Sequence, residues 1–90
     1  MTDEETKYDK SLINRLARAT GHLKSIRSMV EDGRDCSEVL IQLAAVRSAV
    51  NGAGKEILRQ YVDECIEAAL AEDNQESLKK LNKAIDSFVK

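Results

Sequence analysis

The stretch SLINRLARATGHLKSIRSMV, residues 11–30, contains the pattern that decides the fold. Its apolar residues recur at alternating steps of four and three, as they do in the heptad seam of a helix that packs against another helix. These residues are Leu12, Leu16, Ala19, Leu23, Ile26 and Val30. The spacing therefore predicts a first helix over about residues 8–31.

A second helix is predicted directly after this one. Gly33 is a stop signal, and Asp35 with Glu38 has the spacing of a capping box that starts a new helix. Its apolar stripe continues to about Leu70, interrupted only by the small residues 51–54. Two glycines inside a helix cost about 1 kcal/mol each relative to alanine. They indicate either a break or a place where another backbone approaches closely, and we favour the close approach.

A short third helix is predicted at the end of the chain. Asp73 and Glu76 form a second capping box. A narrow apolar face follows, made of Leu78, Leu81, Ile85 and Phe88. Residues 1–7 are polar and are predicted to be a flexible tail, so residues 8–90 form a single domain. The expected fold class is all-α, with three helices in each protomer.

Composition limits the class of protein further. The chain has 90 residues, of which 42% are hydrophobic and 33% are charged, and it contains no proline. A chain this short buries a modest fraction of its surface, and oligomerisation is a common way to complete its core. No apolar run has transmembrane length, and the start MTDEE lacks the pattern of a signal peptide. We expect a cytoplasmic oligomer that has no membrane partner.

The chain has two cysteines, Cys36 and Cys65. On one continuous helix they would share a face but lie roughly 43 Å apart, whereas a disulfide needs Cα atoms within about 7 Å. Two copies packed antiparallel would place each Cys36 opposite the other copy's Cys65, with the crossing beside residues 50–52. The alternative is that the glycines break the helix and that both cysteines are ordinary core residues.

The chemistry of such a cysteine pair depends on Tyr61, one turn before Cys65. A metal sensor would favour histidine there, because imidazole and thiolate on one face make a compact soft site. Two thiolates alone can still hold Cu(I). The other reading is dithiol chemistry, in which one thiolate attacks a sulfane sulfur or disulfide and the second cysteine resolves the product. The helix N-terminus favours Cys36 as the nucleophile, although Asp35 and Glu38 oppose this effect, and Cys65 is then the resolving thiol.

Two basic stripes predict a polyanionic partner despite the net charge of −2. Either stripe alone is usual for a solvated helix face, but two stripes on a symmetric oligomer can span phosphates on duplex DNA. No phosphate-binding loop or aromatic platform is present, so binding would depend on charge and DNA shape. The first stripe contains Asn14, Arg15, Arg18 and His22, and the second contains Arg47, Asn51, Lys55 and Arg59.

Several of these residues together resemble a known family. The segments Asn14-Arg15-Leu16-x-Arg18 and Cys36-x5-Gln42, with Gly21 and Cys65, are similar to the CsoR/RcnR family of small all-helical bacterial repressors. The resemblance implies an antiparallel dimer, a tetramer built from two dimers and double-stranded operator DNA as partner. It also implies an effector site between subunits, near Cys36 of one and Cys65 of the other.

The resemblance also bears on the effector. Copper sensors of this family look like Cys, His and Cys at positions 36, 61 and 65, and this chain has Tyr61 in the middle position. That departure is similar to the persulfide-sensing, CstR-like branch, whose cysteines react with polysulfides to form sulfur bridges between subunits. The implied protein represses sulfide-detoxification genes and needs no cofactor. Nickel, cobalt and formaldehyde sensors of the family use histidines or an N-terminal proline, which this chain lacks at the matching places.

Three points stay open. A Cu(I)-sensing repressor is the alternative within the family, and a helical interaction module with inert cysteines is the alternative outside it. Family members often carry a basic residue where this chain has Gly52, so Arg15 and Arg18 carry over, while Arg47 and Lys55 are inferred substitutes. Tyr61 either packs over the thiols or hydrogen-bonds one of them. No acid/base pair or activated nucleophile predicts an enzyme.

Overall fold

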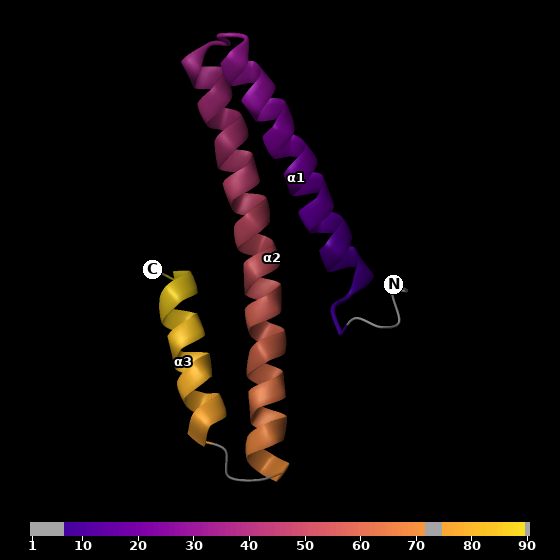
Figure 1. Ribbon diagram of the computed structural model, residues 1–90, viewed down its shortest axis with the longest axis vertical. Coiled ribbons are helices and arrows are strands. Elements are labelled where there is room, and N and C mark those ends of the chain that lie inside the picture. Colours follow the sequence, from indigo (N-terminus) through magenta and orange to yellow (C-terminus); the bar gives the residue numbers. More distant parts are fainter. Residues whose placement is uncertain (1–6, 72–74, 90) are drawn as a thin grey trace. The chain divides into compact units, whose positions relative to one another are not determined.

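The computed structural model describes residues 7–71 and 75–89 of the chain. It contains α1 (Lys10–Glu31), α2 (Cys36–Ala71) and α3 (Gln75–Val89), with no strand in these residues. The predicted all-α fold with three helices is confirmed. The chain divides into two compact units, Met1–Ala53 and Gly54–Lys90, so α2 contributes to both. Figure 1 shows α1 antiparallel to the first part of α2, and α3 antiparallel to its last part.

The core of the first unit uses every second residue of the predicted seam. The buried side chains recur at intervals of seven residues on each helix, which keeps them on one face. They are Leu12, Ala19 and Ile26 on α1, with Val46 and Ala53 on α2.

The other half of the seam remains at the surface of the single chain. Leu16, Leu23 and Val30 are 40%, 51% and 60% exposed. The prediction that all six seam residues face inward is therefore wrong for one chain, because α1 packs against only one helix in its unit. A row of large apolar side chains is left uncovered.

Gly33 ends α1 as predicted. Its φ is +73°, and its N–H donates to the Val30 carbonyl at 3.1 Å while the Arg34 N–H donates to the Met29 carbonyl at 2.9 Å. These two bonds form a Schellman motif, which satisfies carbonyls at the end of the helix. Glycine is favoured here because a side chain is strained in the left-handed conformation.

The start of α2 is capped by Asp35. The Asp35 carboxylate accepts hydrogen bonds from the Ser37 hydroxyl and from the Ser37 N–H, the latter at 3.1 Å. These two bonds, that of the hydroxyl first, hold the pKa of Asp35 below its usual value. The Glu38 carboxylate accepts two bonds from the Arg34 guanidinium, at 2.9 and 3.1 Å. The Asp35 half of the predicted capping box is thus confirmed, and Glu38 secures the preceding turn.

Helix α2 continues through its glycines without a break, so the alternative of a broken helix is wrong. The atoms that approach the glycines belong to side chains of the same chain, and the expected backbone contact is corrected accordingly. A Cβ at Gly52 would lie 2.7 Å from Nη2 of Arg15 in the first unit. In the second unit the ring of Phe88 occupies the space beside Gly54.

The second unit joins the last part of α2 to α3. Cys65 is its buried residue, and Leu81, Ala84 and Ile85 of α3 are half-buried. Glu76 lies in the first turn of α3, whereas Asp73 of the predicted capping box lies outside the described residues, as do residues 1–6 of the predicted tail. Among the described helices, none is both long and apolar enough to cross a membrane.

The Schellman turn gives a direct test with a matched control. We expect Gly33→Ala to lower the free energy of unfolding by about 1–2 kcal/mol, because alanine is strained at this φ. Gly21→Ala, inside α1 with nothing within 4 Å of the added Cβ, is expected to raise it by up to about 1 kcal/mol. Urea denaturation followed by circular dichroism measures both. A Gly33→Ala protein as stable as the unmodified chain would contradict the role of this turn.

Candidate functional site

The basic stripe of α1 borders a hollow in the first unit. Arg15, Arg18 and His22 line it together with Ala19 and the α2 residue Ala49, and its volume is about 310 Å³. The two alanines contribute only methyl groups, so space remains between the larger polar side chains. The structure thus brings together three of the predicted DNA-binding residues in what we call the basic hollow.

Arg15 is held partly inside this unit. Its side chain is half-buried, and its guanidinium lies against α2 at Gly52. Any side chain at position 52 would displace the guanidinium from this place. Gly52 therefore positions Arg15, a function that its sequence context alone did not reveal.

His22 links the two helices of the first unit. Its Nε2 lies 2.6 Å from Oε1 of Gln42, and both side chains are half-buried. An amide oxygen only accepts hydrogen bonds, so the imidazole Nε2 carries the proton in this arrangement. The sequence analysis used Gln42 only as part of a motif and missed it as the partner of His22.

The other predicted DNA-binding residues lie outside the basic hollow. Asn14 on α1 and Arg47 on α2 are exposed, and neither lines it. Lys55 is also exposed and belongs to the second unit. These three residues remain predictions as contacts to DNA.

Cys36 is exposed in the first turn of α2. It borders an apolar hollow of about 320 Å³, to which Val30, Val39 and Leu40 also contribute, together with Arg34. Its thiol is therefore accessible to small molecules in the single chain. The predicted position in the first helical turn is confirmed.

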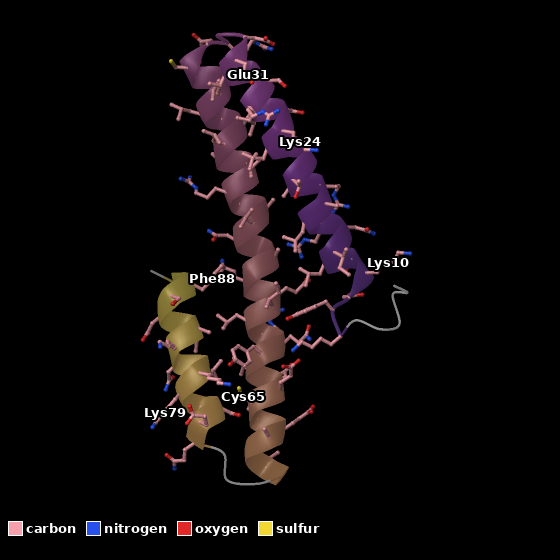
Figure 2. The ribbon with its side chains drawn as sticks, viewed as in Figure 1. Lys10, Lys24, Glu31, Cys65, Lys79 and Phe88 are labelled. Atoms are coloured by element: carbon pink, nitrogen blue, oxygen red, sulfur yellow. The ribbon has the colours of Figure 1, made fainter. Side chains whose placement is uncertain are left out.

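Cys65 is in the opposite situation. It is only 4% exposed, and its thiol donates a long hydrogen bond to the Ser77 carbonyl at 3.8 Å. Figure 2 shows its sulfur between α2 and α3 of the second unit. Tyr61, one turn earlier on α2, is half-buried. Neither cysteine forms a disulfide, and the two belong to different units.

The donor set bears on whether a metal fits. Among residues 7–71 and 75–89, no three His, Cys, Asp or Glu side chains are grouped so that they could hold a metal ion. The three positions expected to form an effector site supply two thiols and the phenol of Tyr61. A phenol is a poor ligand for soft metals, so these residues do not fit a three-ligand copper or nickel site, whereas two thiolates alone suit Cu(I).

Residues 8–87 match the family model described as metal-sensitive transcriptional repressor. The chain belongs to this family. The predicted resemblance to CsoR/RcnR repressors is thereby confirmed at the level of the family. Its members are transcriptional repressors and not enzymes.

Three relatives illustrate this membership. RcnR of Citrobacter koseri is 31% identical over 84% of this chain and 86% of its own length. The solved structure of the nickel-responsive regulator InrS has a TM-score of 0.78 and 41% identity, covering 93% of this chain and 97% of InrS. The crystal structure of the copper-sensing repressor CsoR with Cu(I), from Geobacillus thermodenitrificans NG80-2, has a TM-score of 0.83 and 31% identity, covering 100% and 92%.

The hydrogen bond between His22 and Gln42 is expected to stabilise the pairing of α1 with α2. A double-mutant cycle with His22→Ala and Gln42→Ala should give a coupling of about 0.5–1.5 kcal/mol in the free energy of unfolding. The matched control pairs Lys24→Ala, at an exposed position of α1, with Gln42→Ala, and these two effects should add. Zero coupling between His22 and Gln42 would show that this contact contributes nothing to the pairing.

Proposed function

We propose that this family member is a DNA-binding repressor that senses persulfides or polysulfides through Cys36 and the Cys65 of a second subunit. Tyr61 is the observation that carries this proposal. It stands where the resemblance to copper sensors calls for histidine, and it leaves two thiols without a third soft ligand. By the same resemblance, the repressed genes would serve sulfide detoxification.

The different environments of the two thiols support a two-step reaction. The thiolate of exposed Cys36 attacks a sulfur of the polysulfide, one sulfur–sulfur bond breaks, and a thiolate leaves. Cys65 of the second subunit then attacks the sulfur chain on Cys36 and expels a second thiolate, so the subunits become joined through sulfur. Both cysteines are oxidised, the polysulfide is reduced, and the two thiol protons end on the leaving groups.

The uncovered apolar side chains support the proposed oligomer. Leu16, Leu23 and Val30 form a row on α1, and α2 exposes Leu40, Leu43 and Val50. A second copy that covered such residues would add the apolar burial that one short chain lacks. We propose an antiparallel dimer, and a tetramer of two dimers, in which the unbroken α2 carries Cys36 to the partner's Cys65.

The basic hollow supports the proposed contact with DNA. Arg15, Arg18 and His22 gather there, on a part of α1 that contains no acidic residue. Arginines grouped in this way suit the phosphates of duplex DNA. Where family members often carry a basic residue, this chain has Gly52, and the guanidinium of Arg15 lies beside it.

The sulfur chemistry is tested by intact mass under non-reducing conditions. After the reduced protein is treated with an organic polysulfide, we expect linked dimers that carry added sulfur between Cys36 and Cys65. Cys36→Ala and Cys65→Ala should each prevent this linkage, because a bridge needs both thiols. Hydrogen peroxide serves as the comparison, since it oxidises thiols without adding sulfur. Unmodified monomer after polysulfide treatment would refute persulfide sensing.

Contact with DNA is tested by replacing the basic hollow. Arg15→Ala and Arg18→Ala should each weaken binding to duplex DNA from upstream of the protein's own gene, by about tenfold at moderate salt. Each should also lower the dependence of log K on log salt by about 1. Lys24→Ala removes an exposed charge of α1 outside the hollow and should have a smaller effect. Undiminished binding by both arginine variants would remove the basis for this interface.

Cu(I) sensing is the second candidate. It is favoured by the similarity to the copper-sensing repressor of Geobacillus thermodenitrificans and by the two thiols, which are soft ligands. Stoichiometric Cu(I) binding that weakens affinity for DNA, in a protein that does not respond to polysulfide, would establish it in place of persulfide sensing.

A further inference from the structure

We propose that α3 is a cover for Cys65, and that the docking of Phe88 on Gly54 controls how fast this thiol reacts. The cover itself follows from contacts within the second unit, whereas its importance for sensing rests on the proposed function. Phe88 and Gly54 would then be positioning residues for the second step, in which Cys65 closes the sulfur bridge.

Two contacts hold α3 against α2. Near the start of α3, the Ser77 carbonyl accepts the hydrogen bond of Cys65, and near its end the Phe88 ring rests on Gly54. The two contact points are 11 residues apart on each helix, as expected for antiparallel helices that rise equally per residue. Figure 2 shows Phe88 near the C-terminal end of α3, with Cys65 farther along α2.

The contact with Ser77 depends on the form of the thiol. Only the protonated thiol can donate to a carbonyl, so the reactive thiolate has no such bond. A closed cover therefore favours the unreactive form and also excludes the attacking partner. Cys36, by contrast, is exposed at its own site.

The docking of α3 is shallow enough to open. The helix has 15 residues, none of those described is fully buried, and an isolated helix of this length is marginal in water. Half-buried Leu81, Ala84 and Ile85 supply the remaining contact surface. Elements with so little buried apolar surface separate locally at low free energy. Phe88 is consequently a large part of what keeps the cover closed.

Gly54→Ala distinguishes a cover from general stability. Its Cβ would meet the Phe88 ring and displace it, while alanine itself favours the helix by up to about 1 kcal/mol. The substitution should expose Cys65 without loosening α2. Phe88→Ala should expose the same thiol by removing the ring. Val89→Ala, at a position that is 70% exposed, is the matched control on α3.

The experiment measures alkylation of each cysteine by N-ethylmaleimide in the full-length protein, with intact and peptide mass spectrometry. We expect slow alkylation of Cys65 in the unmodified protein. Gly54→Ala and Phe88→Ala should accelerate it by several-fold to about tenfold, with Cys36 and the Val89→Ala control unchanged. Both variants should also form polysulfide-linked dimers faster.

Several results would overturn the proposal. Cys65 could react as fast in the native protein as in urea, or both variants could leave its rate unchanged. An equal rise at both cysteines would indicate general unfolding, and faster alkylation without faster linkage would show that the cover does not control sensing. Alkylation requires neither polysulfide nor DNA, so a failure of the proposed function would be seen separately from a failure of the cover.

Discussion

The left-handed turn at Gly33 is the constraint on which the basic hollow depends. It reverses the chain between α1 and α2 and so fixes which residues of the two helices lie at the same height. Arg15 lies 17 residues before Asp32, and Gly52 lies 17 residues after Asp35, so equal helical rise brings them together. The same register pairs His22 with Gln42. A change in this turn would shift every contact of the hollow at once.

Local signals made much of the fold predictable. The helices, the stop at Gly33 and the cap at Asp35 each follow from neighbouring residues, and the spacing of Arg15, Arg18 and His22 placed them on one face. The exposed half of the seam was not predictable, because a repeat of four and three presents two apolar rows and only the number of packed helices decides which is covered. Gln42 and Phe88 were missed because their contacts depend on register between helices.

The glycines show how one signal can have two meanings. Gly52 and Gly54 were interpreted as a crossing point of backbones, since small residues permit close approach. Each instead receives a side chain from its own unit, Arg15 in the first and Phe88 in the second. Gly52 thereby serves the proposed contact with DNA, and Gly54 serves the helix that covers Cys65. Two neighbouring small residues connect the helix of the sensor cysteines to both parts of the proposed function.

The central claim is that linkage of Cys36 to the partner's Cys65 releases DNA. Its most direct measurement is fluorescence anisotropy of duplex DNA from upstream of the protein's own gene, titrated with reduced and with polysulfide-treated protein. The predicted result is an affinity at least about fivefold lower after treatment, in the range typical of allosteric coupling, and restored by dithiothreitol. An affinity that is unchanged by polysulfide but lowered by Cu(I) would contradict the claim and identify a copper sensor.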